Sequence, residues 1–322
     1  MLRQLLARLA TGAGVVAGVV ILTFLLLHAA PGDPALRLLG PTATPAQLAA
    51  LRHSLGLDRP LADQLGRWLE RFARGDWGTS IATGRPVRAL IAAAWPETLE
   101  LVGLSLLLSY ALGVGVGAVQ AARAGSRLDT ALSVGSVTLF ALPGYWLGLM
   151  LIMVGTYWWK LFPAFGASGY DADFLAPWGR TADALRHLAL PLLTLTLIGI
   201  GSVARFARGA MVDARREPFV VTARAKGLGR AKVERHVRRN ALIPVLTLLG
   251  LSLPALFSGA VFVEAVFAWP GVGRVLVEAV QARDYPVVMA ATAVSAVLVV
   301  AGNLLTDVVV TGLDPRLRER GA

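Results

Sequence analysis

The stretch "TARAKGLGRAKVERHVRRNALIPVLTLLG", residues 222–250, joins a dense run of basic residues directly to an apolar run. The apolar part continues to about residue 263, and a helix of about 20 mostly apolar residues is enough to cross a bilayer. Lys and Arg beside a membrane span are typical of its cytoplasmic side. The stretch therefore indicates a membrane protein. It carries more charge than topology alone requires.

The composition of the whole chain agrees with this interpretation. Of 322 residues, 56% are hydrophobic and 16% charged, with a mean hydropathy of +0.63, whereas soluble domains carry about 25% charged residues. The net charge of +11 would suggest a nucleic-acid partner in a soluble protein, but cytoplasmic loops explain it in a membrane protein. We therefore expect a bilayer as partner and no nucleic acid.

The side chains that hold metals are sparse. The chain has no cysteine, which excludes disulfides, thiolate metal sites and a cysteine nucleophile. Its four histidines are scattered without paired metal-ligand spacing. They are His28, His53, His187 and His236. We expect no metal site.

Six apolar segments are long enough to span the membrane. They cover residues 9–29, 98–122, 130–159, 188–206, 242–263 and 286–311. The third contains Pro143-Gly144, where a kink is expected. The first resembles a secretory signal, with small residues after it, but its apolar run exceeds the about 7–15 residues of a signal core, so we favour an uncleaved helix. The predicted fold is all-α, a polytopic membrane protein with six transmembrane helices in one permease domain, 1–322.

The basic residues of the short loops set the orientation of these spans. With six spans, four basic segments fall on one side, so both termini are expected to be cytoplasmic. These segments hold Arg3 and Arg8; Arg123 and Arg127; eleven residues from Arg205 to Arg239; and Arg316, Arg318 and Arg320.

Three segments are then external. The first, residues 31–97, carries a capping-box pattern at Thr44 and Gln47, with Pro45 at the first helical position. We expect two amphipathic helices there, followed by a Gly-rich loop at 75–87. Residues 160–187 form the second external loop, with Tyr170 and Trp178 as interface anchors, and residues 266–286 form the third.

Enzyme motifs are missing from the sequence. None of the three lysines follows a glycine, so there is no phosphate-binding P-loop, and the "GLG" at 227–229 is only a fragment of a dinucleotide motif. There is no G-x-S-x-G and no H-E-x-x-H. Glu100 and Asp307, the latter on one helix face with Asn303, are better explained as polar groups at helix ends. We expect no enzyme activity and no cofactor in this chain.

The basic loop, residues 207–241, has an internal order. Pro218 is expected to begin a short helix that Gly227 or Gly229 closes, with Phe219, Val220 and Ala223 on its apolar side. A second helix from residue 230 runs back into the fifth span. A short helix held between two membrane helices suits docking into a groove on a partner.

Motifs along the whole chain resemble one known family. Residues 222–250 resemble the cytoplasmic EAA loop of type I ABC importer permeases, and most closely the dipeptide/oligopeptide branch, which includes nickel and glutathione importers. Other segments fit in the same order. They are "LLHAAPGDPA" (26–35), "LGLDRPL" (55–61), "GDWGTS" (75–80), "PETLEL" (96–101), "FAWPGVGRVLVEAVQARDYPVV" (267–288) and "NLLTDVV…LDPRLR" (303–318).

The resemblance implies that the loop holds a coupling helix seated in a cleft of a cytoplasmic ATPase. The motif's small residue and glycine fall at Ala223 and Gly227, whereas its leading Glu falls at Val221, a departure for which Glu217 is not a sure substitute. The implied coupling residues are Glu217, Phe219, Ala223, Arg224, Ala225, Lys226, Gly227 and Leu228.

The resemblance also implies a location and partners. It implies a multi-pass protein of the bacterial cytoplasmic membrane, paired with a homologous permease subunit, two ATPases that bind ATP and Mg, and an external solute-binding protein. Peptide is the expected substrate, with nickel and glutathione as alternatives. A self-powered secondary transporter or channel, and a membrane scaffold that recruits proteins or lipid, remain open.

Overall fold

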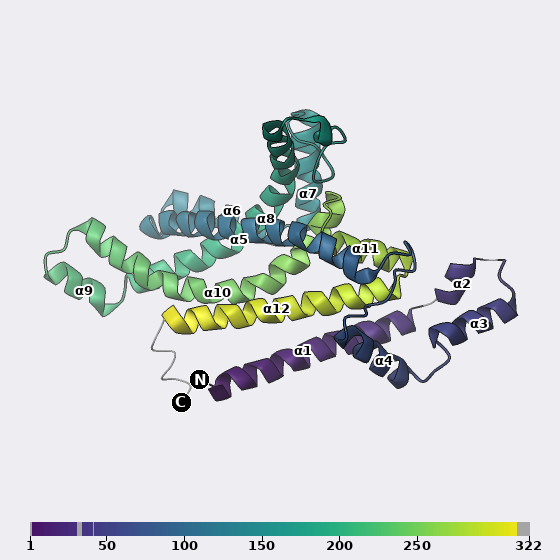
Figure 1. The fold of residues 1–322 in the computed structure, drawn as a ribbon. Helices are drawn as coiled ribbons and strands as arrows, with labels where there is room; N and C mark the ends of the chain where they lie inside the picture. The colour runs from purple at the N-terminus through teal and green to yellow at the C-terminus, as the bar shows by residue number, and fades with distance from the viewer. Residues whose placement is uncertain (1, 31–33, 41, 314–322) are drawn as a thin grey trace. The chain divides into compact units, whose positions relative to one another are not determined.

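The computed structural model describes residues 2–30, 34–40 and 42–313, and the regular secondary structure of this part is helical apart from one isolated bridge, Thr79–Pro86 (Figure 1). The predicted all-α class is confirmed. The elements are α1 (Leu2–Ala29), α2 (Pro34–Leu39), α3 (Pro45–Leu55), α4 (Leu61–Ala73), α5 (Val87–Ala122), α6 (Arg127–Ala141), α7 (Gly144–Ile152), the π-helix η1 (Met153–Trp158), the 3-10 helix η2 (Ala172–Phe174), α8 (Pro177–Ala214), α9 (Pro218–Ala225), α10 (Arg230–Val266), α11 (Val272–Ala282) and α12 (Tyr285–Leu313).

Among the described residues, four helices are long and apolar enough to cross a membrane, or five with one bent pair. They are Leu6–Ala29, Val87–Ala122, Pro177–Ala214 and Tyr285–Thr306, and the bent pair is Arg127–Ala141 with Gly144–Trp158. The predicted segment 242–263 lies inside α10, where several side chains between 243 and 259 are outside the described part. So are the side chains of Arg3 and Asp307, and all of Arg316, Arg318 and Arg320.

The third predicted span is broken rather than kinked. The two halves of this segment meet at 101°. Leu142 and Pro143 are both extended, with ψ of 133° and 130°. A residue that precedes proline is pushed out of the helical region, so α6 ends at Ala141 and a new helix begins at Gly144.

Two spans and two loops differ from the prediction. The helix α5 begins at Val87 rather than 98, and α8 begins at Pro177, so the predicted loop 160–187 is helical from 177 onward. A search for apolar residues finds only the part of a helix that lies in the membrane. Polar residues continue the same helix beyond it. The predicted loop 266–286 also contains a helix, α11.

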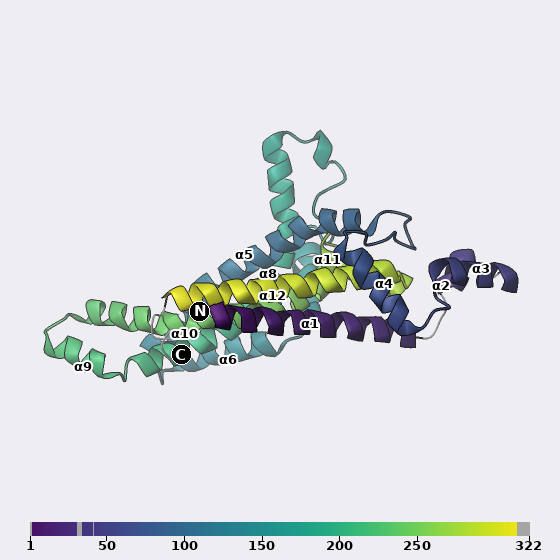
Figure 2. The same ribbon diagram turned by 60° about the horizontal axis from the view of Figure 1, so that its bottom comes forward.

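The chain forms two compact units. Unit 1 comprises residues 1–96 and 271–300. Within it, α1 and α12 lie side by side (Figures 1 and 2), and Val20, Phe24, Met289 and Ala293 are buried between them. The predicted capping box of α3 is present, since Thr44 and Gln47 bond each other's backbone N–H.

Unit 2 comprises residues 97–270 and 301–322. Its helices α5 and α8 approach closely at Gly117, where an added Cβ would lie 2.7 Å from the Ala204 carbonyl oxygen. A buried carboxylate that the sequence did not single out, Glu264, accepts a hydrogen bond of 2.7 Å from Thr98 Oγ1. Buried charges need such partners, so Glu264 fixes α10 against α5.

Candidate functional site

The short helix α9 stands at the turn between α8 and α10, as the basic loop predicted (Figures 1 and 2). Pro218 occupies its first turn, where a missing N–H costs no helical hydrogen bond. Glu217 precedes it in an extended conformation, with φ −68° and ψ 146°, and its carboxylate accepts no capping hydrogen bond. The chain therefore leaves α8, turns, and starts a separate helix at Pro218.

The end of α9 is closed by glycine. Lys226 is the C-cap, and Gly227 follows with φ +74°. The Gly227 N–H bonds the Arg224 carbonyl at 2.9 Å, and the Leu228 N–H bonds the Ala223 carbonyl at 3.2 Å. This pair of bonds is the Schellman motif, which ends a helix by placing a residue in the left-handed region. Of the two predicted closing glycines, Gly227 is the one used.

The two faces of α9 have different surroundings. Val220 is 2% exposed, and Phe219, Ala223 and Leu228 are half-buried beside it. They pack against α5, α8 and α10 through Ala121, Met211, Ala214, Val233, Val237 and Ala241. The apolar side of α9 is therefore covered by the chain itself. The helix is anchored through it.

The remaining predicted residues are exposed. They are Glu217, Arg224, Ala225, Lys226 and Gly227. Val221, where the motif's Glu would fall, is 68% exposed, so the departure from the motif lies on the free face. The predicted set thus divides into an anchoring group of Phe219, Ala223 and Leu228 and an exposed group. The exposed group, with Val221 and Thr222, is called the docking face below.

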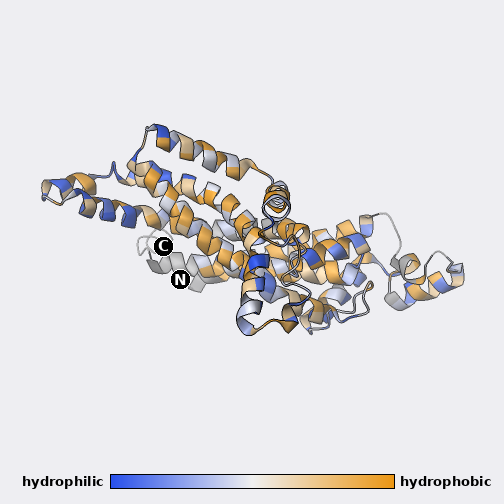
Figure 3. Cartoon of the chain, turned by 90° about the horizontal axis from the view of Figure 1, so that it is seen from above, coloured by the Kyte–Doolittle hydropathy of each residue, from blue (hydrophilic) through white to orange (hydrophobic). Residues whose placement is uncertain are grey.

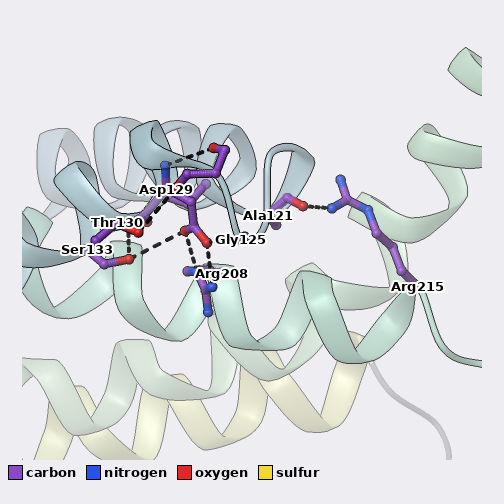
Figure 4. Close-up of polar contacts among 9 residues, drawn as sticks. Ala121, Gly125, Asp129, Thr130, Ser133, Arg208 and Arg215 are labelled. Carbon is purple, nitrogen blue, oxygen red and sulfur yellow. Dashed lines mark hydrogen bonds and ion pairs between the residues drawn. The ribbon is translucent and has the colours of Figure 1, made fainter.

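Two arginines, Arg208 in α8 and Arg215 directly after its end, join neighbouring helices (Figure 4). Arg215 donates to the Ala121 carbonyl at the end of α5 and pairs with Glu234 of α10 at 2.7 Å. Arg208 pairs with Asp129, at the start of α6, through two hydrogen bonds of 2.7 Å. Asp129 also accepts the Gly125 N–H at 2.9 Å. The sequence had assigned these arginines to the topology signal alone, and no spacing rule pairs residues 79 positions apart.

Residues 113–319 match the family described as the inner membrane component of binding-protein-dependent transport systems, and residues 1–102 match its N-terminal companion. The chain belongs to this family. It is a multi-pass component of a bacterial inner-membrane transport system. Members of the family are non-catalytic subunits, in agreement with the missing enzyme motifs.

Known relatives match this transport component over nearly its whole length. It is 38% identical over 302 residues to the oligopeptide transport system permease protein AppB of Bacillus subtilis, covering 93% of this chain and 94% of the relative. It is 39% identical to the probable D,D-dipeptide transport system permease protein DdpB of Escherichia coli, with 95% of each covered. The dipeptide transport system permease protein DppB of Escherichia coli is 34% identical, with 99% and 100% covered.

A solved structure supports the fold. A crystal structure of an amino acid ABC transporter with histidines matches with a TM-score of 0.51 at 16% identity, covering 68% of this chain and 92% of that one. At this identity the likeness concerns the fold alone.

A large share of the positive charge of this transport component lies around α9. Hydrophilic residues gather at the α8–α9–α10 turn, at the left of Figure 3, whereas apolar residues follow the long helices. Exposed cations on this turn include Arg216, Arg224, Lys226, Arg230 and Lys232. In the described residues, no group of three or more His, Cys, Asp or Glu side chains has the geometry of a metal site.

Proposed function

We propose that this chain is the permease subunit of an ATP-driven peptide importer and forms half of its translocation path. The full-length similarity to three peptide permeases carries the proposal. In this proposal the domain is one membrane unit, 1–322, with six spans and both termini in the cytoplasm. The fifth of these spans is the segment 242–263 of α10, which, on the described residues alone, is not among the helices long and apolar enough to cross a membrane, and the basic loops support the orientation.

The docking face of α9 is the proposed contact with a cytoplasmic ATPase, which binds ATP and Mg. Val221, Thr222 and Ala225 are small or medium side chains exposed on one side of a helix whose other side is anchored. A convex, short helix of this kind fits a groove. Arg224 and Lys226 add positive charge that favours an acidic partner surface.

Closure of the ATPases on ATP would move α9, and the anchoring group of Phe219, Ala223 and Leu228 would carry that movement into the membrane. Because α9 packs against α5, α8 and α10, a displacement of α9 biases these spans together. Arg215 and Arg208 oppose separate movement of the helix ends. Transport is then a population shift between inward-open and outward-open states, driven by their different affinity for the ATP-bound partner.

The proposed assembly holds a homologous second permease, two ATPases and an external solute-binding protein. The external segments 31–97 and 266–286 are the proposed surface for the binding protein. Nickel and glutathione remain alternative substrates.

Reconstitution tests the proposal against its rivals. We expect peptide uptake into vesicles to require ATP and the ATPase subunits. Uptake that persists without the ATPase would indicate a secondary transporter or channel, and the absence of any flux would indicate a scaffold. ATP-driven uptake of nickel or glutathione but not peptide would leave the coupling proposal intact and correct the substrate.

Two substitutions test the docking face. Ala225→Glu should abolish ATPase binding and uptake while the chain still inserts, whereas Ala124→Glu, the same change at an exposed alanine in the α5–α6 turn, should leave both intact. Unchanged ATPase binding by Ala225→Glu would contradict the docking face.

Gly227 offers a second test, which concerns the conformation of the turn that ends α9. Gly227→Val should strain the turn by about 1–2 kcal/mol because of its left-handed φ, although an added Cβ has nothing within 4 Å. Gly229→Val is the control, since Gly229 has φ −63° and equally open surroundings. If the two variants bind the ATPase and take up peptide equally well, the Schellman turn is not needed for coupling.

A further inference from the structure

A concave site lies within unit 1, away from any residue assigned to coupling. Its cavity has a volume of 640 Å³, within the about 300–1,000 Å³ of typical ligand sites. It is lined by the end of α1, by the segment 53–59 at the end of α3, by α4, by residues 76–81 and by the start of α12. The candidate span of α1 ends at Ala29 and that of α12 begins at Tyr285, so the cavity sits where two spans leave the membrane.

The lower wall of this cavity belongs to the membrane spans. Phe24 and Met289 are 5% and 4% exposed, and Leu27 is half-buried. These residues lie within about two turns of the span ends, which is the depth of the first acyl carbons. The polar side chains of His28 and Gln64 also line the cavity, but they bond each other at 3.2 Å, so the rest of this wall suits an apolar occupant.

The upper wall is aromatic. Trp68 and Trp77 both line the cavity, and Phe72 stacks between them, with ring centroids 4.8 and 5.1 Å away. Tyr285 completes this wall. Trp and Tyr are enriched at the depth of lipid headgroups, because their rings are apolar and their polar atoms reach water.

The rim carries positive charge that is left over after its ion pairs are formed. Arg71 pairs with Asp76 at 2.8 Å, and Glu70 pairs with Arg74 at 2.7 Å. A third acid near the rim, Asp58, is bonded to His53 at 2.7 Å.

Two other rim arginines, Arg59 and Arg67, are exposed and form no ion pair within 4.0 Å in the described part of the chain, and the charge of Arg59 also acts on the neighbouring Asp58. Guanidinium groups bind phosphate oxygens in pairs, so two of them at the mouth of a cavity suit a phosphodiester.

We propose that this cavity binds one anionic phospholipid, with its phosphate on Arg59 and Arg67 and an acyl chain along Phe24, Leu27 and Met289. The order of chemistry from rim to floor, cationic, aromatic and then apolar, is the order of a phospholipid at the membrane surface. A water-soluble ligand would leave the apolar floor unused. The outer leaflet as the source follows from the proposed topology, but the lipid site itself does not depend on it.

Photo-crosslinking tests the site in the assembled transporter. The complex is placed in nanodiscs that contain phosphatidylcholine and a trace of photoactivatable phosphatidylglycerol, and crosslinked peptides are mapped by mass spectrometry. We expect crosslinks at residues 64–77 and 285–289, competed by unlabelled phosphatidylglycerol but not by phosphatidylcholine. Each arginine near a lipid surface contributes about a factor of five in affinity, so Arg59→Gln with Arg67→Gln should weaken competition about 25-fold.

The control is Arg85→Gln, an exposed arginine of the 75–87 loop that does not line the cavity. It should crosslink and compete as the unmodified protein does. Three results would overturn the proposal. They are equal competition by phosphatidylcholine, unchanged competition in the double variant, or lipid crosslinks that map to the solute-binding protein and not to residues 64–77 or 285–289. Uptake assays on the same samples report separately on the proposed transport function.

Discussion

The Arg208–Asp129 pair should stabilise unit 2 more than an ordinary surface ion pair does. Asp129 is 4% exposed and Arg208 is 34% exposed, and both hydrogen bonds between them measure 2.7 Å. Removing one member of a fully buried pair costs about 3–5 kcal/mol, whereas an exposed pair is worth about 0–1 kcal/mol. Because water reaches Arg208, an intermediate cost is expected.

The two single variants should differ in size. Arg208→Met leaves the Asp129 carboxylate buried with the Gly125 N–H and Ser133 as its remaining partners, and should cost about 2–3 kcal/mol. Asp129→Asn leaves a cation that can reach water, and an amide oxygen that can still accept from Gly125, so about 1–2 kcal/mol is expected. The double variant should cost less than the sum.

Heat inactivation of the detergent-solubilised protein measures these costs, with the surviving fraction read by size-exclusion chromatography at one heating rate. A loss of 1 kcal/mol lowers the midpoint by about 2–4 °C in proteins of 150–250 residues, so Arg208→Met should lose about 4–12 °C. Arg216→Met, at a neighbouring exposed arginine, should change the midpoint little. Additive single effects, or equal losses in Arg208→Met and Arg216→Met, would refute the argument that burial gives this pair its strength.

Three further outcomes follow from other contacts. Thr44→Ala removes the capping box of α3 and should cost that helix about 1 kcal/mol, seen as faster amide exchange in its first turn and not in α4. Thr98→Val removes the hydroxyl that bonds Glu264 and should destabilise unit 2 by about 1.5–3 kcal/mol, whereas Thr98→Ser should largely preserve it. The hydrogen bond from Arg71 lowers the pKa of Asp76 below its ordinary value of 3.8. The pair therefore stabilises the folded protein fully above pH 3.8, and this stabilisation is lost as the pH falls through the lowered pKa of Asp76 in the folded state. The difference in melting midpoint between the unmodified protein and Asp76→Asn should vanish only below that lowered pKa.

Local patterns predicted the helices well where a cap or a proline marks an end. Thr44 and Pro45 placed the start of α3, and Pro218 and Gly227 placed both ends of α9. In each case the signal and the structure involve residues within one turn of each other, so no tertiary information is needed.

Contacts between distant segments were not predictable in the same way. Glu264 and Arg208 differ from the chain's other charged residues only in their neighbours, which lie 166 and 79 positions away. The sequence also did not show that Phe219 and Ala223, among the predicted coupling residues, lie on the buried side of α9, because both look equally suited to a partner's groove and to the chain's own core. The search for apolar segments likewise predicted too short a length for α5 and α8, because the ends of these helices are polar.

In the proposed assembly, the length of α8 sets the distance between the bilayer and the ATPase that would bind the docking face. Arg205 is the first cation after the apolar part of this helix, and α8 continues to Ala214 before the turn into α9. At about 1.5 Å per residue this extension measures about 14 Å, more than a Debye length at physiological salt. The docking face is thereby held clear of the membrane's surface potential, so ATPase affinity should be insensitive to the fraction of anionic lipid in the bilayer.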